Sequence, residues 1–412
     1  MILSWLKNHK TEIWIFFLAF GVRFLYAVSV QVKFGSQGFL AYSDAFSFYL
    51  PLAKNLVENH IFSMSAAPPY VPDAYRTPLY PLFLASFLWF KLPIFAIVFA
   101  QNVLAGFMAV LVYRIGILIF NSRNVGFFAA VFMSVEPMSV YWNNLLMSDY
   151  LFAFLFILAF YYFVLRRYYQ FTLFFGLATL TRSVGIYFFP LFLIMMFWRQ
   201  IGLKKIIVST TLFLAVLFPW MLRNKIVFDT WQLSSASWYN LYGVVTSIFA
   251  DREGFILPRP QLPPYDPANI PFYQRHFFEI FKERPWAYAK FYASVVLESL
   301  SKNPYFYLTN YVLKPKLPQL FDENFGKWIF AAAAAVWAFW ALLYAFALLL
   351  FFEKKARIWF YLIFLFFLVN AASVGALGLG ADMSRYMLPL TPFILLFAGA
   401  GFNFIYKKYA AR

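Results

Sequence analysis

Long apolar runs recur along this chain and are separated by short polar segments. Many runs reach about 15 to 25 residues, close to the roughly 20 residues with which a helix crosses a bilayer. The pattern predicts an all-α polytopic membrane protein with about ten transmembrane helices. The first run, 13–30, follows positive residues but is long enough to span, and no small-residue cleavage site follows it, so we expect a retained anchor. Shorter runs near 125–141, 171–181 and 186–198 are expected to be tilted, broken or half-crossing.

The basic residues between these runs predict an orientation, because lysine and arginine stay preferentially on the cytoplasmic side of a membrane. The basic positions that flank the runs are Lys7, Lys10, Arg114, Arg123, Arg166, Arg167, Arg199, Lys204, Lys205, Lys354, Lys355, Arg357, Lys407, Lys408 and Arg412. With all of them in the cytoplasm, both termini lie inside. The protein is then expected to be a multi-pass protein of the cytoplasmic (inner) membrane.

This orientation divides the chain into three parts. Residues 1–222 form an N-terminal transmembrane module that includes an outer loop, 32–92. Residues 223–326 form an outer-face region, expected to be short helices and loops without an apolar core of their own. Residues 327–412 supply the C-terminal transmembrane helices.

The outer loop carries an amphipathic pattern. Ser43 is a favourable helix N-cap, Asp44 falls in the first turn, and apolar residues repeat every three or four positions over 46–57. A second helix is expected to start at Thr77 with Pro78 in its first position, where proline is tolerated. The loop is therefore expected to hold two helices that lie on the membrane surface.

Composition narrows the chemistry. The chain is 63% hydrophobic with a mean hydropathy of +0.68, which predicts contact with membrane lipid. Its formal net charge of +17 follows the membrane orientation, so no nucleic-acid partner is expected. No cysteine is present, which excludes disulfides and thiolate metal sites, and three histidines far apart in sequence do not form a metal motif. No glycine-rich phosphate loop followed by lysine occurs, so nucleotide hydrolysis has no visible machinery.

Seven segments in order carry a resemblance to a known family. They are VRFLYA (Val22–Ala27), SDAFSFYLPLAKNL (43–56), YRTPLYPLFLA (Tyr75–Ala85), LLMSDYLFAFLF (Leu145–Phe156), GLATLTRSVGIYFFP (Gly176–Pro190), PWMLRN (Pro219–Asn224) and RYMLPLTPF (Arg385–Phe393). Together they resemble the GT-C superfamily of membrane glycosyltransferases. The similarity is closer to the branch of protein O-mannosyltransferases and aminoarabinose transferases, which use polyprenyl-phosphate-linked sugars.

The resemblance implies a hexosyl- or pentosyltransferase that works on the outer face, with inversion at the sugar. It implies that Asp44 is the general base that takes the proton of the acceptor hydroxyl. Departing phosphate needs cations, and Arg182, Arg223 and Arg385 are the candidates, because arginine suits bidentate phosphate contact. Three further residues are candidates for binding the acceptor or organising the loop: Tyr75, Arg76 and Asp149.

The sequence departs from the family pattern in two places. Asp149 stands where the family has glutamate, and Asp44 is followed by Ala45 instead of a second carboxylate. The acceptor, whether lipid, protein or glycan, is therefore open. So is the need for a divalent metal ion, for which Asp149 is the candidate ligand.

Simpler interpretations exist for most of these residues. Asp44 and Asp149 each suit the first turn of a helix, where a carboxylate stabilises the helix dipole. Arg223 can snorkel at a helix end. Arg385 has Asp382 as a local partner, and Asp73 is a typical solvated loop charge.

A different class of function fits the hydrophobicity equally well: a transporter or flippase of a lipid-linked solute. Transporters tend to carry ionisable residues and broken helices near the bilayer midplane, often in paired repeats. Here most carboxylates fall in loops and no internal repeat is visible. The sequence favours an enzyme.

Overall fold

The computed structural model describes residues 9–301, 341–342, 345–346, 348, 357–374 and 383–410. These residues are almost all helical or in connecting turns, and none of them forms a strand. The bundle consists of α2 (Lys10–Phe34), α4 (Leu79–Trp89), α5 (Ile94–Phe120), α6 (Arg123–Val135), α7 (Pro137–Asn143), α8 (Ser148–Val164), α9 (Tyr168–Thr181), α10 (Phe189–Trp198), α11 (Leu203–Phe228), α18 (Arg357–Val374) and α20 (Thr391–Ala410). The prediction of an all-α chain is confirmed.

Within the described residues, three helical stretches are long and apolar enough to cross a membrane: Lys10–Leu40, Ile94–Phe120 and Leu203–Phe228. A fourth is reached if α6 and α7, which are bent by 57° where they meet, are taken as one broken span. Shorter apolar helices, including α8 and α20, pack beside them. The membrane character is thus supported, whereas the number of ten spans stays a prediction.

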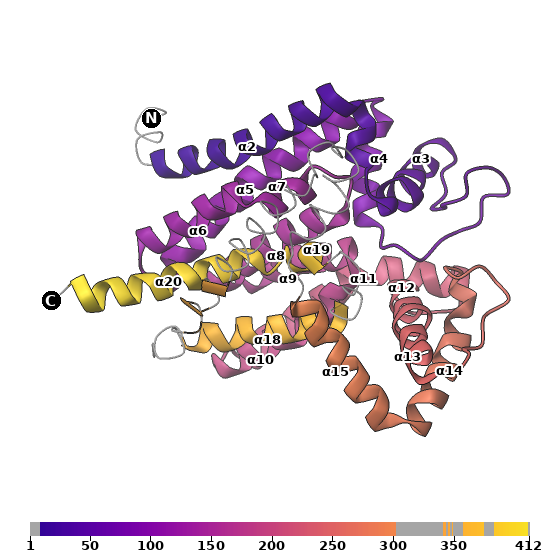
Figure 1. Cartoon of the computed structure of the whole chain (residues 1–412). Helices are drawn as coiled ribbons and strands as arrows, with labels where there is room; N and C mark the ends of the chain where they lie inside the picture. Colours follow the sequence, from indigo (N-terminus) through magenta and orange to yellow (C-terminus); the bar gives the residue numbers. More distant parts are fainter. Residues whose placement is uncertain are drawn as a thin grey trace, which may run out of the picture.

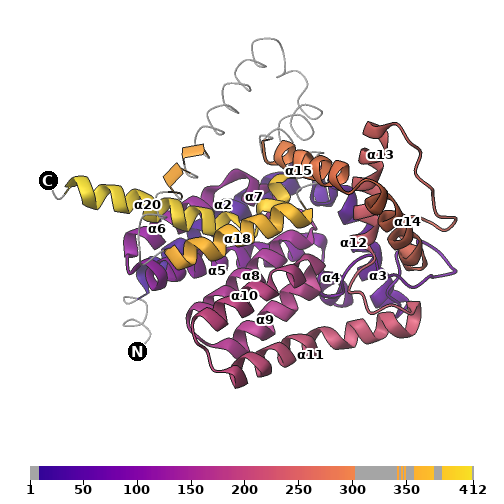
Figure 2. The ribbon, with the colours of Figure 1, turned by 90° about the horizontal axis from the view of Figure 1, so that it is seen from below.

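The long helices lie roughly side by side in one bundle (Figure 1). The start of α2 and the end of α20 lie at one end of it. Two polar regions, residues 32–92 and the described part of residues 223–326, gather at the other end (Figure 1). Their helices there include α3 (Leu50–Glu58), α12 (Ala236–Trp238), α13 (Ser247–Glu253) and α14 (Ile270–Glu283) (Figures 1 and 2). Residues far apart in sequence therefore meet at this end.

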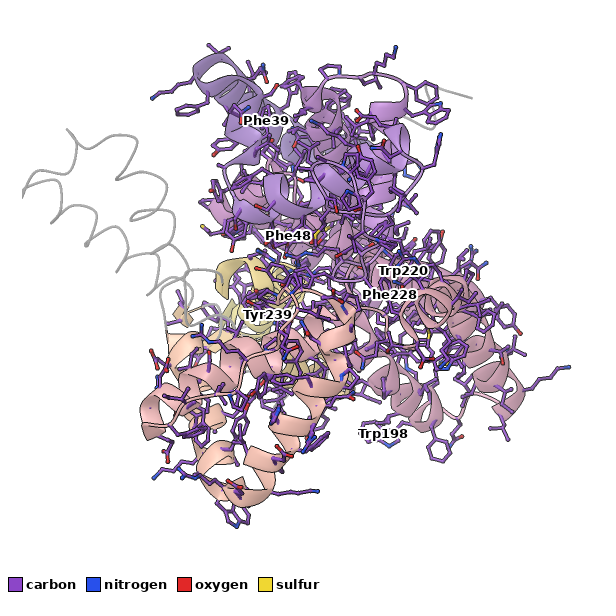
Figure 3. The ribbon with its side chains drawn as sticks, turned by 90° about the vertical axis from the view of Figure 1, so that its right-hand side faces the viewer. Phe39, Phe48, Trp198, Trp220, Phe228 and Tyr239 are labelled. Atoms are coloured by element: carbon purple, nitrogen blue, oxygen red, sulfur yellow. The ribbon has the colours of Figure 1, made fainter. Side chains whose placement is uncertain are left out.

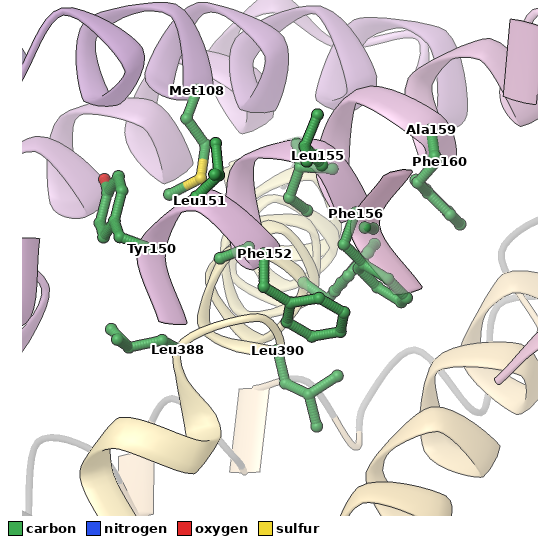
Figure 4. Close-up of a cluster of buried hydrophobic side chains, with 14 of the residues drawn as sticks. Met108, Tyr150, Leu151, Phe152, Leu155, Phe156, Ala159, Phe160, Leu388 and Leu390 are labelled. Atoms are coloured by element: carbon green, nitrogen blue, oxygen red, sulfur yellow. The ribbon is translucent and has the colours of Figure 1, made fainter. Parts of the chain in front are cut away.

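Helix α8 occupies the centre of the bundle. Its Phe152, Phe156 and Phe160 are buried, and Figure 4 shows side chains of α8 close to Met108 of α5 and Leu388. A helix that is apolar all round is typical of such an interior position. Because α8 is packed on all sides, its first turn, which carries Asp149, is held firmly in place.

The break between α6 and α7 is closed by polar side chains. The Glu136 carboxylate accepts hydrogen bonds from the first amides of α7 and caps that helix. Arg23 is fully buried, and its guanidinium donates to the carbonyls of Met133 (2.9 Å) and Ser134 (2.8 Å) and to the hydroxyl of Ser139 (2.8 Å). The last carbonyls of α6 would otherwise have no donor in an apolar interior. The expected interruption near 125–141 is therefore present, with its backbone groups satisfied.

The outer loop differs in detail from expectation. After Asp44 the chain forms a π-helical turn, η2 (Ala45–Tyr49), before α3, which has Pro51 in its first turn. Proline has no amide to donate to the preceding turn, which accounts for the wide turn before it. Helix α4 starts at Leu79, one residue after the predicted first position, Pro78, and the Thr77 hydroxyl does not cap it but donates to the carbonyl of Thr181 (2.8 Å).

The second polar region is more ordered than expected. It contains α12, the π-helical η4 (Tyr239–Thr246), α13, α14 and α15 (Pro285–Ser301). Val245, Phe249, Tyr288, Phe291 and Val295 form a small buried core between these elements. Amphipathic spacing on helices this short does not distinguish burial against a neighbour from burial against lipid, which is why the sequence did not reveal this core.

One of the two predicted boundaries can be compared with the helices. Helix α11 runs without interruption across residue 222, where the N-terminal module was expected to end. The boundary at residue 326 lies outside the described residues, as do Lys354 and Lys355, two of the basic positions from which the orientation was predicted.

Candidate active site

Five predicted residues form one chain of ion pairs at the end of the bundle that carries the polar regions. Arg76 Nη2 lies 2.9 Å from Asp44 Oδ1, and Arg385 Nη2 lies 3.1 Å from Asp44 Oδ2. Arg385 Nε lies 3.0 Å from Asp149 Oδ1, which also pairs with Arg182 Nη1. The order along the chain is Arg76, Asp44, Arg385, Asp149, Arg182.

Each of the five comes from a separate segment. Asp44 precedes η2, Arg76 lies in the connection before α4, and Asp149 is in the first turn of α8. Arg182 follows the end of α9, and Arg385 lies in α19 (Met383–Met387). Only folding brings these segments together, so the cluster depends on the whole described bundle and not on a local motif.

Neither Asp44 nor Asp149 makes a side-chain hydrogen bond that caps the helix it begins, and both face arginines. Asp149 does lie in the first turn of α8, where a carboxylate also stabilises the helix dipole, so its ion pairs come in addition to that simpler role. Asp382, the local partner expected for Arg385, lies outside the described residues.

A cavity of about 570 Å³ lies against this cluster. The three arginines Arg76, Arg182 and Arg385 line it, whereas the two carboxylates with which they pair are not part of its wall. Hydroxyl and amide groups of Thr77, Ser183, Ser237 and Asn240 contribute polar lining. Apolar lining comes from Val184, Leu241, Val245, Val369 and Ala372. The cavity thus offers positive charge beside a surface that is partly apolar.

Aromatic rings pack against the guanidinium of Arg76, which also pairs with Asp44. Its guanidinium carbon lies 4.6 Å from the ring centroids of both Phe48 and Tyr75. Tyr265 packs against Tyr75 and against Tyr239 at 4.6 and 5.0 Å between centroids, and Figure 3 shows Phe48 and Tyr239 where the two polar regions meet. Rings around a guanidinium restrict its motion and attract its charge. Tyr75, predicted to organise the loop or bind acceptor, lies in this group and also lines the cavity.

Two opposed effects act on the pKa of the Asp44 carboxyl. Burial alone would raise the pKa of the Asp44 carboxyl, but the charges of Arg76, Arg385 and Arg182 outweigh burial and hold it below its usual value. The group is therefore ionised at neutral pH. As an isolated base it is weak while both of its oxygens are paired with arginine.

Arg223 lies outside this cluster and does not line the cavity. Its Nη1 donates to the backbone carbonyl of Asp73 at 2.6 Å, and its guanidinium packs on the rings of Trp220 (4.8 Å) and Phe228 (5.0 Å). Figure 3 shows these two rings near one another. Arg223 therefore holds the segment that leads to Arg76.

The same segment contains Asp73, which was expected to be a solvated loop charge. Asp73 is buried, and its carboxylate accepts the amide of Tyr75 at 2.9 Å. Burial raises its pKa to about 6 against the opposing effect of these amides and of Arg76 and Arg223. A side chain that bonds an amide two residues ahead is the turn typical of aspartate, so this position had a readable signal.

The donor set does not fit a divalent metal ion. Among the described residues, no three histidine, cysteine, aspartate or glutamate side chains gather as metal ligands. Asp149 Oδ1 pairs with two guanidinium groups, whose charges would repel a dication there.

Two comparisons of the sequence with known proteins find no match. No protein-family model matches the chain, and no curated protein sequence matches it. The functional interpretation consequently depends on the motifs and on the geometry of this site.

Proposed function

We propose that the chain is a membrane glycosyltransferase that moves a sugar from a polyprenyl-phosphate-linked donor to an acceptor hydroxyl. The observation that carries the proposal is that Arg76, Arg182 and Arg385 line one cavity while Asp44 and Asp149 hold them there. Ionisable residues within membrane-spanning segments are expensive to keep, so a cluster of them beside a cavity supports a functional site.

The charge balance of the ion-pair chain favours an anionic ligand. Three guanidinium groups face two carboxylates, which leaves one positive charge in excess within the chain of pairs. A sugar linked to a lipid through a phosphodiester carries one negative charge. Its binding would balance the cluster, and charge-assisted hydrogen bonds from arginine to phosphate are among the strongest available.

The residues suit a direct displacement at the sugar. The acceptor hydroxyl gives its proton to Asp44 as its oxygen forms a bond to the anomeric carbon, and the bond from that carbon to the phosphate oxygen breaks with inversion. The phosphate leaves with the electron pair as polyprenyl phosphate, and the arginines stabilise the charge that it gains. Arg223 acts from outside the cavity by holding the Asp73 carbonyl.

We further propose that the chain has about ten spans with both termini in the cytoplasm, and that the site lies at the outer face of the cytoplasmic membrane. The basic residues between the apolar runs support this orientation. The apolar part of the cavity lining supports a donor whose lipid stays in the bilayer. The acceptor is a lipid, a protein or a glycan with a free hydroxyl at that face.

Cells of the source organism that lack the gene test the proposal. We expect them to accumulate a polyprenyl-phosphate-linked sugar and to lose one envelope sugar modification. Wild type and Glu58→Gln, which removes an exposed carboxylate from the same loop, restore both, whereas Asp44→Asn restores neither.

Restoration by Asp44→Asn at the wild-type rate would contradict the assignment of the base. Movement of lipid-linked sugar across reconstituted vesicles, without transfer to any acceptor, would instead favour the flippase.

A further inference from the structure

Asp44 is reached from the cavity by way of the two arginines that pair with it. Arg76 and Arg385 line the cavity and each pairs with one oxygen of Asp44, whereas Asp44 itself does not line the cavity. Its side chain is only 13% exposed. An acceptor hydroxyl in the cavity therefore meets guanidinium groups before it reaches the carboxylate.

We propose that the donor phosphate and Asp44 compete for Arg76 and Arg385, so that donor binding is what releases the Asp44 carboxylate to the acceptor. This inference rests on the proposed function and adds an order to it, with donor first and acceptor second. The same two cations hold the base inactive in the empty site and hold the phosphate in the filled one.

Arg385 is tethered in a way that permits such an exchange. Its Nε is bonded to Asp149 Oδ1, while a different nitrogen, Nη2, reaches Asp44. Asp149 is in turn fixed by Arg182 and by its place on the packed helix α8. Because Nε and Nη2 are separate donors of one planar guanidinium, a phosphate can replace Asp44 at Nη2 while Nε stays bonded to Asp149.

Arg76 has spare hydrogen-bonding capacity. Its Nε is buried without a hydrogen-bond partner among the described residues, although the guanidinium is held between Phe48 and Tyr75. A buried donor without a partner is unfavourable, and an incoming phosphate oxygen would satisfy it. In the empty site the Nε–H of Arg76 therefore lacks a hydrogen bond that the donor phosphate would supply.

Loss of these pairs would also strengthen the base. The charges of Arg76 and Arg385 lower the pKa of the Asp44 carboxyl, and that effect weakens once a phosphate shares them. Asp44 would then accept a proton more readily while the sugar donor is in place.

Binding of undecaprenyl phosphate to the purified full-length protein in detergent, followed by native mass spectrometry, tests the competition. Asp44→Asn removes the competing charge and keeps the side-chain size, so we expect about tenfold tighter binding than in the wild type. Glu58→Gln, which removes the same charge from an exposed position on the loop, should bind as the wild type does. Equal or weaker binding by Asp44→Asn would overturn the competition.

A second measurement uses only the wild-type protein. Dicyclohexylcarbodiimide modifies protonated carboxyl groups in apolar surroundings, and peptide mass spectrometry reports which residue reacts. We expect labelling of Asp44 to rise several-fold when undecaprenyl phosphate is added, because the arginines leave the carboxylate. Unchanged or reduced labelling at saturating lipid contradicts the release.

The two ideas fail in different ways. If the wild type shows no saturable binding of undecaprenyl phosphate, or if Arg385→Gln binds it equally well, the proposed function fails and the competition fails with it. If the wild type binds through Arg385 but neither Asp44 measurement changes as expected, only the competition is wrong.

Discussion

Two buried arginines show how the same residue serves two purposes in this molecule. Arg23 and Arg385 are 0% and 3% exposed. Arg23 donates to backbone carbonyls and a hydroxyl at the break between α6 and α7 and does not line the cavity beside Arg385. Arg385 pairs with Asp44 and Asp149 and lines the cavity.

Arg23 and Arg385 differ in the groups that accept their hydrogen bonds. Neutral carbonyls at a helix end need a permanent donor, so Arg23 is committed to the fold. The carboxylates of the cavity cluster are shared among three arginines, which leaves positive charge that a ligand can use. Burial alone therefore does not identify a functional arginine in a membrane protein, whereas the chemistry of its partners does.

The largest expected effect is the loss of stability that follows a substitution of Arg23. Arg23→Met leaves the carbonyls of Met133 and Ser134 without this donor, and at about 1–3 kcal/mol for each unsatisfied buried group we expect a loss of roughly 2 to 6 kcal/mol in unfolding free energy. Unfolding in a detergent titration measures it. Lys33→Met, at an exposed position of the same helix, is the control and should change stability by less than about 0.5 kcal/mol. Equal stability of the two variants would mean that Arg23 does not hold the break.

The next effect is on activity at Arg385. Arg385→Gln removes one cation from the departing phosphate, and we expect the rate of sugar transfer to fall by about 10² to 10³. Arg223→Gln should lower the rate by about tenfold or less, because Arg223 acts through the Asp73 carbonyl and does not line the cavity. The transfer assay in membranes compares the two. A loss at Arg223 as large as that at Arg385 would place Arg223 on the phosphate.

A third effect is the pH dependence that Asp73 contributes. Burial raises the pKa of Asp73 from 3.8 to about 6, so between these values the folded protein holds its proton more tightly than the unfolded chain. The contribution of Asp73 to stability is thus greatest below the lower value and falls as pH rises to about 6, by at most about 3 kcal/mol.

Asp73→Asn should remove this part of the pH dependence. Thermal unfolding in detergent at pH 4.5 and pH 7 measures the difference for the wild type and the variant. An identical change with pH in both proteins would show that Asp73 does not carry it.

The smallest effect concerns the contact between α4 and α9. Thr77→Val removes the buried hydrogen bond to the carbonyl of Thr181, next to Arg182, and we expect a cost of about 1 kcal/mol. Thr210→Val removes a bond within one helix, to the carbonyl of Ile206, and should cost less. Chemical unfolding of both variants tests the order, and a reversed order would mean that this contact does not stabilise the cavity end.

The sequence predicted the helices better than it predicted which distant segments contact one another. Apolar runs predicted the helices, and Asp44, Arg76, Asp149, Arg182 and Arg385 were each singled out from motifs. Their pairing was not visible, because Asp44 and Arg385 lie 341 positions apart and only the packed bundle joins them. Periodicity reports which face of a helix is apolar and carries no information about which distant helix end comes beside it.

Local backbone detail explains the remaining differences. The π-helical turns η2 and η4 insert an extra residue per turn, which helical periodicity does not anticipate. Asp73 looked like a solvated loop charge because its burial depends on Arg223 and the segment after α11, far along the chain. A partner distant in sequence decided its environment.

The most direct test is a cryo-electron microscopy structure of the protein in lipid nanodiscs with saturating undecaprenyl phosphate. We expect phosphate density within hydrogen-bond distance of Arg76, Arg182 and Arg385, with the lipid leaving along the apolar part of the cavity. Phosphate density at another site, or an empty cavity in a structure that resolves these arginines, would contradict the assignment of the three arginines to a phosphate-linked donor.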